Sequence, residues 1–167
     1  MKLLNPGLDL RAYRSALGAY PTGVTVITTV AQGRIAAIVA NSFTSVSLEP
    51  PLLLWCIARQ SGRHGHFCEA ERFTISVLTD DQRDICRSLA RPGGGEPPTQ
   101  HLIAMASGPP AVAGALAAFE CETWSVAEHG DHSLIVGKVV HYHANPVQTP
   151  LIFCGGGFAS LASMTSD

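Results

Sequence analysis

Charged side chains are scarce in this sequence. Only 14% of its 167 residues are charged, with 11 Lys and Arg against 13 Asp and Glu, and the formal net charge is -2. No basic run could neutralise a series of phosphates, so nucleic acid is not an expected partner. Because 46% of the residues are hydrophobic and so few are charged, we expect some apolar surface to be buried in an oligomer.

Cysteines are few and widely spaced. The five are Cys56, Cys68, Cys86, Cys121 and Cys154, an odd number with no close pair. This spacing predicts neither a disulfide framework nor a metal site of the CxxC type, and it fits a reducing cytoplasm. Those at 56, 121 and 154 lie in apolar, strand-like surroundings and are expected to be buried.

Long hydrophobic runs are also missing. The apolar stretch within Met1–Gly7 is far too short for a signal peptide. Residues 102–119 carry no charge and approach the length that spans a bilayer, but Gly108-Pro109-Pro110 interrupts them. We therefore expect neither secretion nor a membrane span.

The hydrophobic pattern predicts more strands than helices. Apolar spacing near the helical period, with caps, predicts helices; runs of β-branched residues bounded by turn residues predict strands. The expected helices are residues 8–17, 61–70 starting at Ser61, and 82–90 capped by Asp80; the expected strands are 24–30, 35–39, 52–57, 73–78, 120–127, 133–143 and 151–154. A loop rich in Gly and Pro is expected over 91–98. Strands do not alternate with helices as in a Rossmann fold, so we expect one mainly β domain over residues 1–167, a closed antiparallel barrel with a few peripheral helices.

The most distinctive segment is the polar run that ends in two prolines. Residues 41–47 read Asn-Ser-Phe-Thr-Ser-Val-Ser and lead to Pro50 and Pro51. Hydroxyl and amide groups at this density suit the polar edge of a flat heterocycle. Composition alone favours a solvated surface turn instead, because the same residue types are common in ordinary loops.

Two longer blocks and one short motif resemble a known family. Residues 20–29, Tyr-Pro-Thr-Gly-Val-Thr-Val-Ile-Thr-Thr, and residues 41–51 are similar to the signature of the short-chain flavin reductases. Gly130-Asp131-His132, with Gly137, resembles the glycine-aspartate-histidine turn of that family. The resemblance extends over residues 13–158 and implies the FMN-binding split β-barrel, an antiparallel fold of Greek-key type.

The resemblance also implies a flavin site for FMN or FAD. The residues that it places at the isoalloxazine and ribityl are Asn41, Ser42, Phe43, Thr44, Ser45, Val46 and Ser47, with Cys56 and Ala58 on a second strand. Arg59 and Ser61 are the candidates for the flavin phosphate, because an arginine fork and a helix start both favour an anion. Gln82 and Arg87 are weaker phosphate candidates by the same analogy. A surface arginine beside a helix cap is the alternative interpretation of Arg59 and Ser61.

A second implied site holds NADH or NADPH. By the resemblance, His132 positions the nicotinamide as the catalytic residue, and Asp131 and Phe158 lie beside it. Hydride transfer from nicotinamide C4 to flavin N5 requires close stacking and no protein acid or base, so the lack of an obvious one is expected. No GxGxxG motif opens a helix after a strand, so the nucleotide would fold over the flavin.

The carboxyl end departs from the family pattern. Where the family often has Arg-Gly-x-Tyr, this chain has Gly155-Gly156-Gly157-Phe158. A cation suited to the nucleotide pyrophosphate is therefore missing there. This leaves two hypotheses: an NAD(P)H-dependent flavin reductase that supplies reduced flavin to a separate oxygenase, and a split-barrel protein that only binds or stores flavin.

The resemblance bears on the oligomeric state, and the spacing of the histidines bears on metal binding. Members of the family are usually homodimers, which agrees with the low charged fraction, and a homodimer is expected here. Four histidines, at 129, 132, 141 and 143, lie on one predicted hairpin. Two-residue spacing of histidines is common on solvated strands, and zinc needs further ligands at fixed geometry, so no metal site is predicted.

Overall fold

The computed structural model describes Asn5, Gly7, residues 9–90, Pro97, residues 99–145 and residues 147–161. Most of the expected loop over 91–98 lies outside these residues. The helices are α1 (Leu10–Gly18), α2 (His64–Cys68), α3 (Arg83–Ala90) and the short η1 (Asp80–Gln82) and η2 (Thr99–His101). The strands are β1 (Thr22–Gly23), β2 (Thr25–Ala31), β3 (Arg34–Ala40), β4 (Thr44–Leu48), β5 (Pro51–Ala58), β6 (Arg72–Val77), β7 (Leu102–Ile103), β8 (Ala111–Val112), β9 (Ala117–His129), β10 (His132–Ala144), β11 (Leu151–Cys154) and β12 (Gly157–Ser160).

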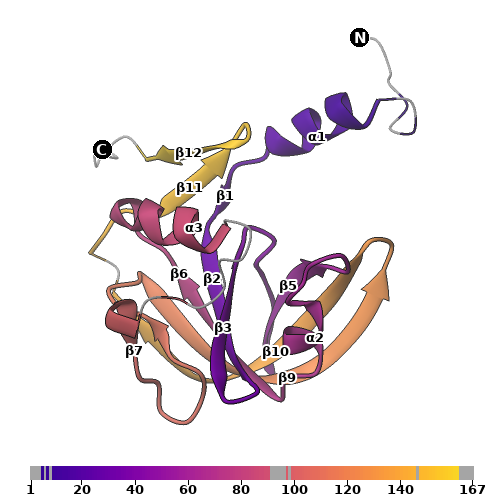
Figure 1. The fold of residues 1–167 in the computed structure, drawn as a ribbon. Helices are drawn as coiled ribbons and strands as arrows, with labels where there is room; N and C mark the ends of the chain where they lie inside the picture. Colours follow the sequence, from indigo (N-terminus) through magenta and orange to yellow (C-terminus); the bar gives the residue numbers. More distant parts are fainter. Residues whose placement is uncertain are drawn as a thin grey trace.

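One seven-stranded sheet dominates the molecule. Its strand order is β3-β2-β6-β9-β10-β5-β4, and every pair in it is antiparallel. The sheet is strongly curved, and β3 contacts β5 although the two are not hydrogen-bonded neighbours (Figure 1). Three short strands, β1, β11 and β12, form a second small sheet. The mainly β antiparallel architecture with few helices is as the sequence predicts.

Two tight turns build the main hairpins. Gln32 and Gly33 both have positive φ, 53° and 76°, and join β2 to β3. This is the combination that a type I′ turn requires, and its twist matches that of the strands. Gly130, with φ 60°, begins the turn between β9 and β10. Both hairpins agree with the sequence prediction.

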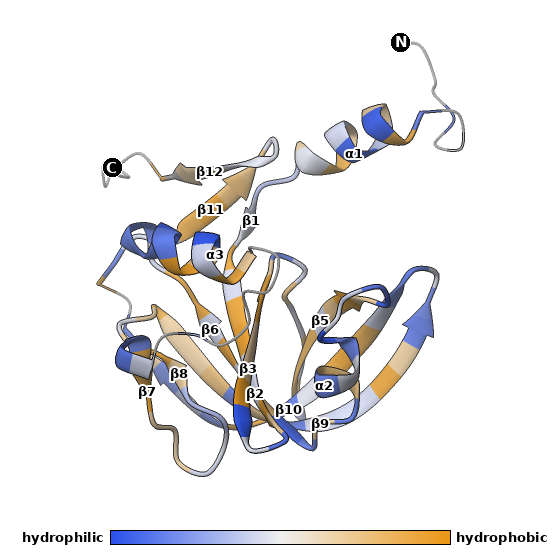
Figure 2. Ribbon diagram, viewed as in Figure 1, coloured by the Kyte–Doolittle hydropathy of each residue, from blue (hydrophilic) through white to orange (hydrophobic). Residues whose placement is uncertain are grey.

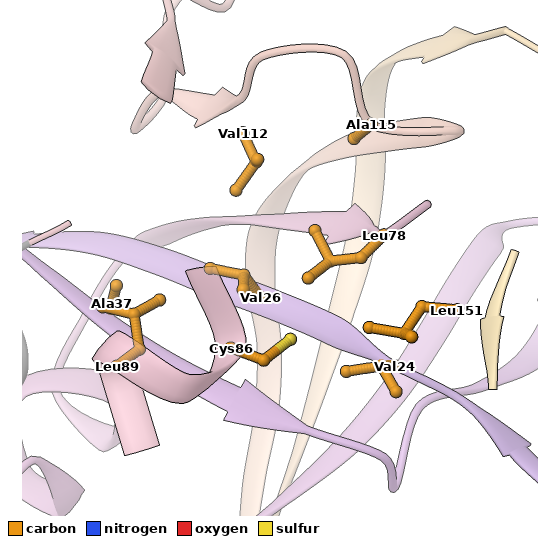
Figure 3. Packing of buried hydrophobic residues seen from close by; sticks show 9 residues of the cluster. All are labelled: Val24, Val26, Ala37, Leu78, Cys86, Leu89, Val112, Ala115 and Leu151. Atoms are coloured by element: carbon orange, nitrogen blue, oxygen red, sulfur yellow. The ribbon is translucent and has the colours of Figure 1, made fainter. Parts of the chain in front are cut away.

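The buried residues form two clusters on the sheet. Figure 3 shows the first, in which Cys86 and Leu89 of α3 pack against β2, β3 and Leu151 of β11. The second is centred on Trp55, whose ring makes edge contacts with Phe67 of α2 at 5.2 Å and Phe73 of β6 at 6.0 Å. Figure 2 places the hydrophobic colour mainly on the sheet strands and the hydrophilic colour on α2 and the tip of the β9–β10 hairpin. The two helices thus cover different parts of one sheet.

Helix α1 is different, because it buries none of its residues. It starts as expected, with the Asp9 side chain accepting a hydrogen bond from the N–H of Ala12 at 2.9 Å. Its apolar side chains Leu10, Tyr13 and Leu17 remain 67%, 44% and 57% exposed. Figure 1 shows α1 standing apart from the body of the chain. An isolated helix of this length is only marginally stable in water, so packing of its apolar face against another surface would stabilise it.

Several element predictions need correction. The helix expected from Ser61 starts only at His64 and ends at Cys68, because Gly62 disfavours helix before it and no side chain caps it. The capping residue of this segment is Thr79, the N-cap of η1, and not Asp80, and it forms a capping box with Gln82. Strand β12 was not predicted.

The cysteines also differ in part from expectation. Cys121 is buried as predicted, whereas Cys56 is half-buried and Cys154 is exposed. Cys154 ends β11, where the chain turns into Gly155 and Gly156 at the surface. All five thiols are free. Burial raises the pKa of the Cys86 thiol to about 11 and that of Cys121 to about 12. Among the described helices, none is long and apolar enough to cross a membrane.

Candidate functional site

The segment before β4 is fastened to β5 by one hydroxyl. The β4–β5 ladder pairs Thr44 with Leu54, and continuing this register would place residue 42 opposite Cys56. There the Ser42 hydroxyl accepts a hydrogen bond from the N–H of Cys56 at 2.9 Å and donates to its carbonyl at 3.2 Å. A side chain thus replaces one rung of the backbone ladder. Ser42 therefore acts here as a latch for the segment.

The remaining side chains of residues 41–47 divide into inward and outward groups. The Phe43 ring points to the core and stacks on Phe119 of β9, with centroids 6.1 Å apart. Asn41, Thr44, Ser45 and Val46 are exposed, and Ser47 is half-buried. Of the polar ones, Thr44 donates to the Ser45 carbonyl at 3.4 Å, whereas the side chains at 41, 45 and 47 make no hydrogen bond within the described part of the chain. These three are free to bind a ligand.

The end of β5 meets the tip of the β9–β10 hairpin. Ala58 pairs with His132, and the N–H of Arg59 donates to the Asp131 carbonyl at 2.9 Å. The Arg59 guanidinium lies 3.3 Å from a Glu128 carboxylate oxygen, with both side chains at least half exposed. Such a pair is screened by water and contributes little to stability, so the arginine can exchange it for another anion. The segment after β5 and the hairpin turn thus form one surface.

His132 and Asp131 form a hydrogen-bonded pair in this surface. His132 Nδ1 lies 2.8 Å from Asp131 Oδ1. The hydrogen bond and the charge of the His132 ring hold the pKa of the Asp131 carboxyl below its ordinary value. With Nδ1–H donating to Asp131, the other ring nitrogen, Nε2, is left for a ligand. The imidazole is 46% exposed, which allows that access.

The segment that carries Ser61 is held by backbone and by α2. The Ser61 N–H donates to the Ala58 carbonyl at 2.9 Å, and its hydroxyl accepts from the N–H of Arg63 at 3.3 Å. Ser61 is therefore not at a helix start, and the predicted helix dipole at this position is wrong. At the start of α2, His64 Nε2 lies 2.8 Å from the hydroxyl of the buried Ser133 on β10. This contact docks α2 beside the hairpin.

Gln82 and Arg87 make their hydrogen bonds and ion pairs with residues outside this surface. The Gln82 amide accepts from the N–H of Thr79 at 3.2 Å and donates to the Ala113 carbonyl at 2.8 Å. Arg87 pairs with Asp84 on the same helix at 3.2 Å and is exposed. Gln82 thus has a capping role that the sequence prediction did not include. Among the described residues, no contact links either residue to residues 41–47.

Phe158 lies on β12, where its ring packs edge-on against Phe153 at 5.9 Å. Both rings cover the first hydrophobic cluster. No contact among the described residues joins Phe158 to His132. The structure therefore brings together residues 41–47, 56–61 and 131–132 but leaves Phe158 with the small sheet.

A buried carboxylate lies on the same hairpin, outside the candidate site. Glu120 on β9 is fully buried; burial opposes its ionisation, but hydrogen bonds from the Ser107 hydroxyl at 2.7 Å and the Ser107 N–H at 3.2 Å outweigh this and keep its pKa below 4.5. His141 Nδ1 lies 3.6 Å from the same carboxylate. Within the described residues, no group of three or more His, Cys, Asp or Glu side chains could hold a metal ion.

The comparison with family models decides which family this site belongs to. The model described as "Flavin reductase like domain" matches residues 17–162. The chain belongs to this family. Its fold accordingly matches those of solved flavin reductases, with Streptomyces globisporus C-1027 NADH:FAD oxidoreductase SgcE6, in complex with NAD and FAD fragments, at a TM-score of 0.92 and 34% identity over 99% of this chain and 100% of that chain.

Two curated relatives illustrate the range of the family. The chain is 44% identical over 153 residues to FMN reductase (NADH) SmoA of Agrobacterium fabrum, covering 91% of this chain and 86% of that protein. It is 35% identical over 159 residues to the flavin-dependent monooxygenase reductase subunit HsaB of Mycobacterium tuberculosis, covering 92% and 83%. Some other relatives are longer, and the chain spans 66%, 48% and 43% of three of them.

Sequence reasoning did not find every residue of this surface. Glu128 pairs with Arg59, and Arg63 donates to the Leu89 carbonyl at 3.4 Å, where it meets the end of α3. A cation at a helix carboxyl end is favoured by the dipole. Both contacts join elements distant in sequence, so no local pattern could have predicted them.

Proposed function

We propose that this protein is an NADH-dependent flavin reductase. The observation that carries the proposal is the convergence of residues 41–47 and His132 on the two edges of β5. The relatives agree with it, because SmoA is named an FMN reductase that uses NADH and SgcE6 an NADH:FAD oxidoreductase. NADPH in place of NADH, and FMN against FAD, are distinguished by the assay below.

The donor set of the loop fits a flavin. Asn41, Ser45 and Ser47 offer amide and hydroxyl groups that nothing else in the described chain occupies, and Val46 adds an exposed apolar surface. Such groups suit the polar edge and flat face of an isoalloxazine. A bound flavin would supply the hydride-accepting N5 of the reaction. The latch at Ser42 keeps the loop in place before the ligand arrives.

Arg59 is the phosphate ligand that we propose for the flavin. Its guanidinium presents several donors, its pairing with Glu128 is solvent-screened, and it lies directly after β5. Ser61 contributes less to phosphate binding, because its N–H already donates a hydrogen bond to the Ala58 carbonyl. Gln82 and Arg87 remain proposals of lower rank, since no contact within the described part of the chain links them to the loop.

His132 positions the hydride donor in this proposal. Asp131 fixes the ring by the hydrogen bond to Nδ1, and Nε2 can donate to or accept from the nicotinamide carboxamide. No proton needs to move during hydride transfer, so the histidine orients and does not act as an acid or base. Phe158 stays a candidate for the nicotinamide only if ligand binding brings β12 toward the hairpin.

A steady-state assay tests the function. Purified protein is mixed with NADH or NADPH and with FMN, FAD or no flavin, and loss of the reduced nicotinamide absorbance is followed. We expect rapid oxidation that requires added flavin and prefers NADH. A flavin that stays bound through gel filtration without any nucleotide oxidation would instead support the flavin-storage hypothesis, which the glycines at 155–157 favour.

We also propose that reduced flavin passes to a separate oxygenase. HsaB is named a reductase subunit of a flavin-dependent monooxygenase, and this chain has no second cofactor motif that would consume the reduced flavin itself. Reduced nicotinamide and five free thiols fit the cytoplasm. Hydroxylation by a purified oxygenase component should depend on this protein and NADH.

A homodimer completes the proposal. The apolar face of α1, formed by Leu10, Tyr13 and Leu17, is uncovered in the single chain, and Tyr20 just after it is 76% exposed. A second copy would cover this face and stabilise a helix that is otherwise marginal. Light scattering after size exclusion should give twice the mass of the chain; the mass of a single chain would contradict the dimer.

A further inference from the structure

Strands β5 and β10 have two different faces. Buried and half-buried residues alternate along Leu52–Ala58 and along His132–Lys138, as expected when successive side chains point to opposite sides of a sheet. The buried set includes Trp55 and Ile135 of the second hydrophobic cluster. Four of the half-buried residues are apolar and neither belong to nor pack against either cluster: Leu54, Cys56, Leu134 and Val136. These four, here named the apolar floor, therefore lie on the face that the core does not use.

The register of the strands makes the apolar floor continuous. Residues directly opposite each other in an antiparallel pair have their side chains on the same face. Leu134 pairs with Cys56 and Val136 pairs with Leu54, so the four side chains form two adjacent rows. On β9 these rows continue with the small residues Ala127 and Ser125. The apolar floor is thus a compact patch that extends over neighbouring strands.

The groups of the candidate site lie on this same face. His132 pairs with Ala58, in the row next to that of Leu134. On the other edge of β5, Thr44 pairs with Leu54. The Ser42 hydroxyl is bonded to the backbone of Cys56, which holds the polar segment along that edge. The apolar floor is therefore bounded by the histidine at one end and by the hydroxyls of residues 42–47 along one side.

We propose that the apolar floor, with Leu134 as its main contact, supports the isoalloxazine ring of the flavin. This inference rests on the proposed function. Sites for flat heterocycles combine an apolar surface for the ring face with a few polar groups for the ring edge, and here residues 42–47 lie beside such a surface. The same arrangement orients the ring, because only its edge can reach those hydroxyls while its face covers the leucine.

The position of Leu134 also decides which ring face stays accessible. Leu134 is two residues from His132, about 7 Å along the strand, so a nicotinamide held at the histidine can overlap a ring that lies on the leucine. The floor covers the ring face that rests on it. The hydride donor must therefore stack on the opposite face. Leu134 is thus a positioning residue for the reaction as well as a binding residue.

Binding of two flavins to four proteins tests the inference. The proteins are the wild type, Leu134→Asn, Leu134→Met and the control Leu102→Asn, which makes the same change at a half-buried leucine of β7, outside the seven-stranded sheet. The ligands are FMN and riboflavin, which has the ring but no phosphate, and quenching of their fluorescence gives the dissociation constants. We expect Leu134→Asn to weaken both flavins by the same factor, about tenfold, because apolar contact with the shared ring is lost. Leu134→Met should stay within about twofold of the wild type, and Leu102→Asn should bind both flavins as the wild type does.

A second variant serves if Leu134→Asn does not fold, which thermal unfolding of the flavin-free proteins shows. Val136→Thr keeps the shape and the strand preference of valine and places a hydroxyl in the floor. It should weaken FMN and riboflavin equally, by about threefold, because a smaller apolar contact is lost.

Three results would overturn the inference. The first is unchanged binding of both flavins to the folded floor variants. The second is weaker binding of FMN alone, since the contact would then be with the phosphate end. The third is a change of mass in light scattering, from a dimer in the wild type to a single chain in Leu134→Asn, since a second copy of the chain would then cover the floor.

These measurements use no NADH, so the inference and the proposed function can fail separately. If the wild type binds flavin but oxidises neither NADH nor NADPH, the proposed function fails, and the dissociation constants still decide the role of Leu134. If NADH oxidation is rapid and the floor variants bind flavin as the wild type does, the inference alone fails. A wild type that binds neither FMN nor riboflavin overturns the inference.

Discussion

Replacing Ser42 by Ala tests whether the latch on β5 organises the loop. The change removes the hydroxyl that accepts from the N–H of Cys56 at 2.9 Å and donates to its carbonyl at 3.2 Å. An unsatisfied, partly buried backbone group costs about 1–3 kcal/mol. For a domain of this length each kcal/mol lowers Tm by about 2–4 °C, so we expect Tm to fall by roughly 2–12 °C. The loop should also bind flavin more weakly, because its preorganised state becomes less populated.

Two measurements and one control variant make the test specific. Thermal unfolding of the flavin-free protein gives the stability, and quenching of flavin fluorescence gives the dissociation constant. Ser42→Thr keeps the hydroxyl and should lose far less of both. If Ser42→Ala weakens flavin binding while Tm is unchanged, the hydroxyl contacts the flavin directly and the latch is wrong; if neither quantity changes, the two hydrogen bonds do not contribute.

Three further predictions concern the core, the buried carboxylate and the thiols. A methyl group at Gly137 would collide with the buried Phe73 ring and lie 2.9 Å from Cys121 Cβ. Gly137→Ala should therefore lower the unfolding free energy, measured by urea denaturation, by about 1–3 kcal/mol. Gly62→Ala is the control, because a Cβ there has no atom within 4 Å and should leave the unfolding free energy unchanged. The pKa of Glu120 is lowered on folding, so the ionised carboxylate stabilises the fold above pH 4.5, and this stabilisation is lost as the pH falls through the pKa of the folded state. In Glu120→Gln, the free energy of unfolding should therefore fall less steeply below pH 4.5, as followed by circular dichroism. Cys154 is exposed while Cys86 and Cys121 are buried with pKa values of about 11 and 12, so an aromatic disulfide reagent should modify Cys154 first and Cys154→Ser should remove that fast phase.

Local patterns in the sequence were sufficient for the main hairpins. The turn at Gln32 and Gly33 and the turn at Gly130 lie between β-branched runs, and both were predicted with their strands. Strand β12 was missed because glycines at 155–157 suggest a break in the chain. Gly155 and Gly156, both with positive φ, instead form a tight turn, and Gly157–Ser160 pair with β11.

Long-range register explains what the sequence could not predict at the site. The resemblance placed Ser42 in the flavin loop, but its bonds to Cys56 depend on how β4 pairs with β5, including a bulge between Ser45 and Ser47. The local hydrophobic periodicity of a strand does not determine its partner strand or the register of the pair. The same holds for Gln82, whose amide is directed by a backbone carbonyl thirty-one positions away in sequence. The pairing of His132 with Ala58, next to Arg59, was not predicted, because the resemblance implied only that His132 lies at the nicotinamide.

The position of β5 between β4 and β10 sets the width of the surface proposed to hold the flavin. Strand β4 pairs with one edge of β5 and β10 with the other. Neighbouring strands are about 4.8 Å apart, so the backbones of β4 and β10 lie about 10 Å apart across β5. That span is comparable with three fused rings. Because backbone hydrogen bonds fix it, changes of side chain can alter how tightly a flat molecule is held but not the width of molecule that reaches both sides.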